Sequence, residues 1–171
     1  VSLSNILNSC GAQKGSLYHF FPNGKDELVT ATVEHMADCA FQHNFQRLES
    51  AASTADGLHR LVTDLAKWVD DPECSFAIPF TAIAALTSVD NEGVRLACKT
   101  ALERLEELYR ICLRKDGMTA RESSNLASFI IISIEGAFLL SRTHRTSKPL
   151  RNVATNLRRI ISERVAESRA S

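Results

Sequence analysis

The stretch from Ser2 to Leu28 reads SLSNILNSCGAQKGSLYHFFPNGKDEL, and it predicts two short helices followed by a long one. Ile6 and Leu7 give the first short helix an apolar side. Gly11 then supplies a turn residue that adopts a positive φ at no steric cost. A second turn at Asn23-Gly24 precedes the long helix. Two short helices joined by a glycine-containing turn form a helix-turn-helix unit, and the second helix of such a unit lies in the major groove of DNA.

The second short helix, expected from about residue 13 to residue 20, has two different sides. We expect its inner side to carry Leu17, Phe20 and Phe21. Its outer side is a polar edge made of Lys14, Ser16, Tyr18 and His19. This edge is the part of the unit that would meet DNA.

These residues resemble the tetracycline-repressor (TetR) family of bacterial transcription regulators. The resemblance rests on Ile6, on Gly11, on Lys14-Gly15-Ser16-Leu17-Tyr18-His19-Phe20-Phe21 and on Lys25-Asp26-Glu27-Leu28. The turn Phe21-Pro22-Asn23-Gly24-Lys25, the run Glu135-Gly136-Ala137-Phe138-Leu139-Leu140, Arg142 and Pro149-Leu150 are similar to the LmrA/YxaF-like branch. The resemblance implies an all-α fold with two domains. Residues 1–27 would be a partial helix-turn-helix DNA-binding domain that lacks the family's first helix, and residues 28–171 a ligand-binding and dimerisation domain.

The resemblance also implies which residues face DNA. Lys14 is placed to reach a base edge or a phosphate, and Gly15 allows close approach of the backbone. Phosphate contacts position a protein on DNA, whereas base contacts specify the sequence. The expected set is Ser2, Lys14, Gly15, Ser16, Tyr18, His19 and Lys25. The alternative is that these are ordinary surface residues of a helical bundle.

Composition narrows the class of protein. The chain has 20 Lys and Arg against 20 Asp and Glu, which is not the basic balance of a protein that binds nucleic acid over its whole surface. Its five cysteines are odd in number and far apart, so we expect a reducing compartment and no disulfide framework. The longest uncharged run, 74–89, is interrupted by Pro79 and is too short to span a bilayer. Without a recognisable targeting segment, we expect a cytoplasmic protein with no membrane partner and no cofactor.

After Gly24 the apolar residues recur at three and four positions, which predicts helices throughout. The first of them, from Lys25 to Ser50, would be roughly 39 Å long. Ser53 resembles an N-cap, and Thr119 with Glu122 forms a capping box. The remaining helices are expected at 53–70, 79–89, 91–115, 119–143 and from 148 onward. The sequence therefore predicts an all-α fold.

Aromatic residues of the body are candidates for a small-molecule pocket, because pockets between bundle helices are mainly apolar with a few orienting polar groups. The candidates are Trp68, Phe76, Phe80, Tyr109 and Phe138, with His59 and Glu106 as polar groups. For each residue the alternative is a plain core position. No Arg or Lys cluster lies between Trp68 and Tyr109, so we expect an apolar or aromatic, weakly charged effector.

The last two helices carry wide apolar faces that predict a homodimer through a four-helix interface. The residues expected there are Glu135, Gly136, Leu140, Leu157 and Ile161. Glu135 is either a group that lines a ligand cavity or, the interpretation we favour, a partner of Arg142, Arg145 or the second subunit. An unpaired buried carboxylate is costly.

His35, Cys39 and His43 share one side of the long helix, and imidazole and thiolate suit zinc. Three ligands from one straight helix span about 12 Å, too far to share one ion, so we expect no metal site. We also find no nucleophile–base set. The sequence predicts a ligand-responsive repressor that binds a palindromic DNA operator as a homodimer. The alternatives are an all-α ligand-binding protein or enzyme that uses Glu135 and the histidines, and a helical module that acts only through protein partners.

Overall fold

The computed structural model describes residues 14–74, 78–87 and 91–170. Within these ranges every regular element is helical, which confirms the all-α prediction. The α-helices are α2 (Lys14–Phe20), α3 (Lys25–Glu49), α4 (Thr54–Asp70), α5 (Phe80–Thr87), α6 (Glu92–Lys115), α7 (Ala120–His144) and α8 (Lys148–Ala170). A short 3-10 helix, η1 (Pro72–Cys74), follows α4.

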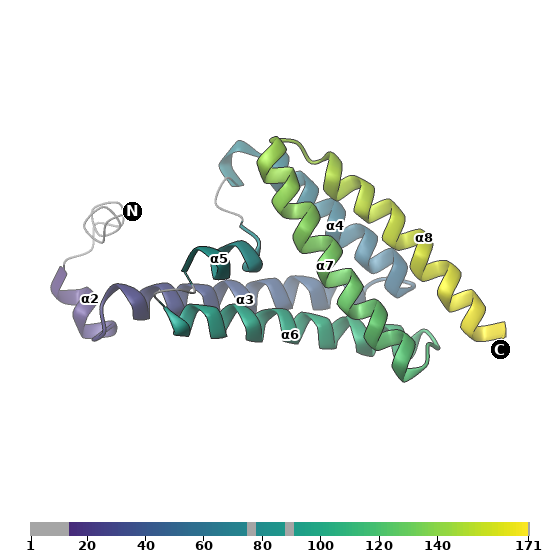
Figure 1. Cartoon of the computed structure of the whole chain (residues 1–171), viewed down its shortest axis with the longest axis horizontal. Coiled ribbons are helices and arrows are strands. Elements are labelled where there is room, and N and C mark those ends of the chain that lie inside the picture. Colours follow the sequence, from purple (N-terminus) through teal and green to yellow (C-terminus); the bar gives the residue numbers. More distant parts are fainter. Residues whose placement is uncertain (1–13, 75–77, 88–90, 171) are drawn as a thin grey trace.

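The helices form two layers that meet at an angle (Figure 1). In one layer α3 packs along α6, and in the other α4 packs along α8. Contacts of α7 with α6 and with α8 join the layers, and α5 lies on α6. The short helix α2 lies at the far end of α3, away from α4, α7 and α8 (Figure 1). The body is therefore connected to α2 through α3.

The helices begin where the sequence places capping residues. The hydroxyl of Ser53 accepts a hydrogen bond from the Asp56 amide at 3.1 Å. Asn91 does the same for the amide of Val94 at 3.0 Å, and Thr119 forms the predicted capping box with Glu122. Each cap satisfies backbone N–H groups that a helix N-terminus leaves without a partner.

The core is built from the inner faces of α3, α4, α6, α7 and α8, and the part between α4, α7 and α8 includes the last helix. Leu58 and Ile130 are fully buried there, and so are Leu157 and Ile161, which are 2% and 0% exposed. The prediction that Leu157 and Ile161 lie in a dimer interface is therefore wrong. The stripe that these two side chains form on α8 is already covered by the chain's own helices, so it offers no surface to a second subunit.

The expected inner side of α2 is also partly wrong. The Phe20 ring is 71% exposed, although Phe21 is half-buried as expected. Within the described residues, Phe20 makes an edge contact with the neighbouring His19 ring. The reason is its position: α2 lies beyond the body, where few described residues are close enough to cover a second ring.

Candidate DNA-reading end and helical body

Helix α2 and the first turn of α3 contain four exposed residues of the seven that were predicted to face DNA. Tyr18 is 47% exposed, and His19, Gly15 and Lys25 are exposed as well. Ser2 and the side chains of Lys14 and Ser16 lie outside the described residues. Tyr18 and His19 belong to α2 and Lys25 begins α3, so the three residues lie at the end of the molecule where Figure 1 shows α2.

The turn between α2 and α3 fixes their relative orientation. Gly24 has a φ of 73°, a left-handed conformation that favours glycine. Its amide donates to the Phe21 carbonyl at 2.8 Å. A Cβ at Gly24 would lie 3.4 Å from the Tyr18 ring. The Asn23 amide donates to the Glu27 carboxylate at 2.9 Å, which closes the turn onto the start of α3.

The same end of α3 is held by α6. The Asn91 side chain reaches the Asp26 carbonyl at 3.4 Å. A Cβ at Gly93 would lie 3.0 Å from the Thr30 hydroxyl, so α6 begins in close contact with the second turn of α3. Further along, the buried Tyr109 hydroxyl donates to the Asn44 side chain at 2.5 Å. These contacts tie α3 to α6 at both ends.

At its C-terminal end α3 meets α4 at a very close crossing. A Cβ at Gly57 would lie 2.9 Å from Leu48 Cδ2, 3.0 Å from Leu48 Cα and 3.2 Å from the Arg47 carbonyl oxygen. Two of these three atoms belong to the backbone and cannot swing away. Only glycine therefore permits this crossing, and beyond it α3 and α4 diverge (Figure 1).

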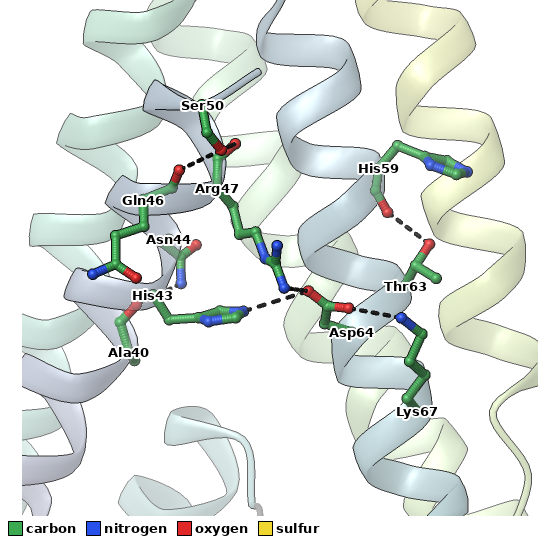
Figure 2. Close-up of polar contacts among 10 residues, drawn as sticks. All are labelled: Ala40, His43, Asn44, Gln46, Arg47, Ser50, His59, Thr63, Asp64 and Lys67. Carbon is green, nitrogen blue, oxygen red and sulfur yellow. Dashed lines mark hydrogen bonds and ion pairs between the residues drawn. The ribbon is translucent and has the colours of Figure 1, made fainter.

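A polar cluster connects α3 and α4 just beyond the crossing. Figure 2 shows His43 and Arg47 of α3 directed at Asp64 of α4. Arg47 Nη2 lies 2.6 Å from Asp64 Oδ2, and Lys67 Nζ donates to Asp64 Oδ1 at 3.0 Å. His43 Nε2 lies 3.8 Å from Asp64 Oδ2, beyond hydrogen-bond distance. The Asp64 side chain is only 14% exposed.

The surroundings of this cluster shift both titratable groups. Burial lowers the pKa of His43, the Arg47 charge lowers it further, and Asp64 acts in the opposite direction. Burial alone would raise the pKa of Asp64. The hydrogen bond from Lys67 and the charges of Arg47 and Lys67 outweigh burial and hold the pKa of that carboxyl below its usual value. The arrangement favours a neutral imidazole beside an ionised carboxylate.

A groove of about 770 Å³ lies between α3 and α6 on the side of the turn that joins α3 to α4. Its apolar wall includes Phe41, Phe45, Leu48, Leu108 and Ile111, and its charged groups are Glu49, Glu103, Arg104, Glu107, Lys115 and Asp116. No pattern in the sequence indicates this groove.

Glu135 has a different partner from the one expected. Its Oε2 atom accepts hydrogen bonds from the amide of Thr81 at 2.9 Å and from the Thr81 hydroxyl at 2.7 Å. The predicted pairing with Arg142 or Arg145 is therefore wrong. The carboxylate instead satisfies the first turn of α5, where amides lack intrahelical partners and favour a negative charge.

Helix α7 carries an open apolar face. Phe129, Ile132, Leu139 and Leu140 are between 46% and 68% exposed. A Cβ at Gly136 would find no described atom within 4 Å. By length and composition α7 could also cross a membrane, with a mean hydropathy of 1.6 and 33% of its most apolar window buried. The buried part of α7 packs in the core, and these exposed apolar side chains lie together on its other side.

Comparison with known proteins agrees with this architecture. A family model for the C-terminal domain of LmrA/YxaF-like transcriptional regulators matches residues 54–156. The chain belongs to the TetR family. The HTH-type transcriptional regulator LmrA of Bacillus subtilis is 30% identical over 153 residues, which cover 90% of this chain and 81% of LmrA. The regulator YxaF of the same organism is 29% identical over 155 residues, covering 91% and 81% respectively.

Solved TetR-family structures share the fold. A TetR transcriptional regulator from Legionella pneumophila superposes with a TM-score of 0.78 at 17% identity, covering 94% of this chain and 86% of that one. Escherichia coli NemR in its reduced form gives a TM-score of 0.74 at 20% identity, covering 91% and 83%. The predicted membership of the LmrA/YxaF-like branch of the TetR family is confirmed.

The structure distributes the predicted ligand residues of this TetR-family body over several environments. Phe80 and Phe138 are buried core side chains, and Tyr109 is occupied by its bond to Asn44. Burial raises the pKa of Tyr109 far above its usual value, so its hydroxyl stays protonated. Phe76 lies outside the described residues.

The other three predicted ligand residues retain some exposure. The Trp68 ring is 38% exposed and lies 5.2 Å from the His43 ring. Glu106 accepts a short hydrogen bond from Ser128, and His59 is half-buried. None of the predicted residues lines the groove between α3 and α6, and their role in binding an effector stays a prediction.

The three residues weighed as metal ligands do not converge. Cys39 Sγ lies 3.7 Å from His35 Nε2 on the exposed side of α3. His43 is directed instead at Asp64 (Figure 2). Among the residues that the structure describes, no group of three or more His, Cys, Asp or Glu side chains is arranged to hold a metal ion.

Proposed function

We propose that this TetR-family protein is a DNA-binding transcriptional repressor that acts as a homodimer on a palindromic operator and is released by a small apolar or aromatic effector. The observation that carries the proposal is the exposure of Tyr18, His19 and Lys25 on α2 and the start of α3, at the end of a 25-residue helix that lies away from α4, α7 and α8 (Figure 1). Exposed basic and hydroxyl side chains at that end suit contacts to phosphates. Family membership supports the assignment.

In a dimer, the α2 ends of the two subunits would contact DNA together. Paired recognition helices read half-sites one DNA turn apart, about 34–36 Å. A small change in the direction of α3 would alter the spacing of the two ends. An effector must bind the DNA-competent and DNA-free shapes with different affinity, because equal affinity shifts neither population.

The experiment is a gel-retardation assay with the complete natural protein and DNA from its own promoter region. We expect retardation at low salt that weakens as salt rises, and stronger retardation than with scrambled DNA of equal length. Absence of any retardation at low salt would refute the DNA-binding role and favour the alternatives, an all-α ligand-binding protein or enzyme, or a module that binds only proteins.

The effector class is tested on the retarded complex. A screen should include neutral and charged aromatic compounds together with phosphorylated metabolites. We expect release by aromatic compounds, because apolar surface contributes roughly 25 cal/mol per Å² removed from water. Release only by phosphorylated anions would contradict the proposed effector class.

A further inference from the structure

We propose that the groove between α3 and α6 is a binding site for an aromatic organic cation. The assignment rests on the proposed function and deepens it, because it places an effector site and names the chemical class of the ligand. Four kinds of observation carry it: the aromatic wall, a protein cation already stacked on that wall, a carboxylate that pairs with no other described residue, and the position of the groove beside the crossing of α3 and α4.

The aromatic wall is formed by two rings one helical turn apart on α3. The Phe41 and Phe45 rings are stacked, with centroids 6.4 Å apart and an interplanar angle of 16°. Phe45 is 40% exposed, and Ile111 opposite it on α6 is 41% exposed. These two side chains leave apolar surface open inside a groove of about 770 Å³, within the range of sites that hold drug-sized molecules.

A cation already occupies half of this wall. The Arg104 guanidinium carbon lies 4.7 Å from the centroid of the Phe41 ring. The same guanidinium donates to Asp38 at 2.7 Å. Ring and carboxylate thus hold a positive group together, a combination that favours cations electrostatically.

The second half of the wall also combines an aromatic ring with a carboxylate, but the Arg104 guanidinium lies over Phe41 in the first half. Phe45 is followed one turn later by Glu49, and both line the groove. In the described part of the chain, Glu49 makes no side-chain hydrogen bond or ion pair, whereas Glu103 is paired with Lys99 and Glu107 with Arg110. A ligand with a flat apolar part and a positive group would cover Phe45 and pair with Glu49. An anion would meet four carboxylates and only two basic side chains on the same walls.

The groove also lies where a bound ligand would contact α3 close to its crossing with α4. Its floor includes Leu48, the residue whose backbone meets Gly57 at the crossing with α4. The turn residues 51–54 line it as well, and this turn is attached to the end of α6 because the Thr54 amide donates to Asp116 at 2.9 Å. A ligand in the groove would therefore contact α3, α6 and the turn between α3 and α4 at once.

The test uses three probes of equal aromatic size that differ in charge: 1-naphthylmethylammonium, 1-naphthalenemethanol and 1-naphthylacetate. Binding to the complete protein is measured by calorimetry at low salt. We expect the cation to bind at least tenfold more tightly than the anion, with the neutral alcohol between them. Phe45→Ala should weaken binding of the cation roughly tenfold, and Phe45→Trp should preserve it. Glu49→Gln should weaken binding of the cation about three- to fivefold and leave the alcohol unchanged.

The matched control is Glu34→Gln, which removes an exposed carboxylate from the same helix outside the groove and should leave all three affinities unchanged. Equal affinities for the three probes, or no effect of Phe45→Ala and Glu49→Gln, would overturn the proposal. A change from dimer to monomer in sedimentation of Phe45→Ala would also overturn it, because a second copy of the chain would then cover the groove. DNA retardation is measured separately without probe. Charge-selective binding without retardation would refute the DNA-binding role alone, and retardation without charge-selective binding would refute this site alone.

Discussion

The surroundings of the His43 side chain make the stability of the folded protein depend on pH. Burial and the Arg47 charge lower its pKa in the folded state. Between that lowered pKa and the ordinary value of about 6.5, the unfolded chain binds more protons than the folded one. The contribution of His43 is therefore complete above the ordinary value and is lost as the pH falls below it.

The first prediction follows from this sign. Lowering the pH from neutral to about 5.5 should decrease the free energy of unfolding measured by urea titration. His43→Gln, which cannot titrate, should reduce that decrease. Asp64 adds nothing in this window, because its lowered pKa makes its contribution disappear only in more acidic solution. An unchanged pH dependence in His43→Gln would show that other groups cause the loss.

The second prediction concerns single contacts to DNA. Lys25→Ala removes an exposed positive charge next to α2 and should weaken binding to every sequence alike, with the salt dependence reduced by about one phosphate contact. Tyr18→Phe should also weaken binding generally, whereas Lys14→Ala should change the base preference. Titrations at several salt concentrations measure these effects. Lys99→Ala on α6 is the control. The prediction is contradicted if Lys99→Ala weakens DNA binding as much as Lys25→Ala does.

Among the helices, the crossing of α3 and α4 gives the third prediction. Gly57→Ala should destabilise the protein by about 1–3 kcal/mol, because the new Cβ meets the backbone of α3. An exposed helix position normally responds in the opposite direction, since alanine is the better helix former by about 1 kcal/mol. Ser124→Ala on the exposed side of α7 serves as the control for a gain in helix propensity alone, with a smaller stabilisation because serine is a better helix former than glycine. Thermal unfolding of both variants measures the change in stability. A Gly57→Ala protein that is as stable as the wild type would contradict the close crossing of α3 and α4.

The attachment of α5 gives the fourth prediction. Glu135→Ala removes the acceptor of two hydrogen bonds from Thr81, a loss of about 1 kcal/mol for a capping group. Hydrogen exchange of α5 amides should accelerate roughly fivefold, while exchange in α6 stays as it was. Equal acceleration in both helices would mean that Glu135 supports the whole body rather than α5.

The helix boundaries could be predicted from the sequence because their signals are local. Ser53 and Thr119 cap helices within four residues of themselves, and Pro72 follows a helix that ends at Asp70. What covers the apolar face of each helix was harder to predict from the sequence. An apolar stripe such as Leu157 and Ile161 shows that a side is covered without showing whether its own chain or a partner covers it.

The same limit applies to the candidate site. The pairing of Glu135 with Thr81 joins residues 54 positions apart, and no spacing in the sequence indicates it. The groove was missed because Phe45 and Ile111 are ordinary amphipathic positions on two separate helices. The exposure of Tyr18, His19 and Lys25 was predicted through a motif whose residues lie together in the chain.

At the scale of the whole molecule, the open face of α7 gives the fifth prediction. Gly136→Arg places a long charged side chain among Ile132, Leu139 and Leu140 and should convert a dimer into a monomer. Leu157→Ala should behave differently, with a loss of about 2–5 kcal/mol in stability from a core cavity and an unchanged association state. Sedimentation and thermal unfolding separate the two outcomes. A wild-type mass equal to one chain at micromolar concentration would contradict dimerisation through α7.

The close contact of Gly57 with Leu48 places a pivot near one end of α3, about which α3 would turn together with α6, because contacts join these two helices at both ends. From Leu48 to Lys25 the helix extends roughly 35 Å, so each degree of rotation about the contact displaces α2 by roughly 0.6 Å. A rotation of about five degrees moves it by about 3 Å, the length of one hydrogen bond. Side chains packed within one turn of the pivot move only a few tenths of an ångström in the same rotation. A rotation of α3 and α6 at this pivot that is too small to disturb the core would therefore be large enough, at the other end, to make or break contacts with a phosphate.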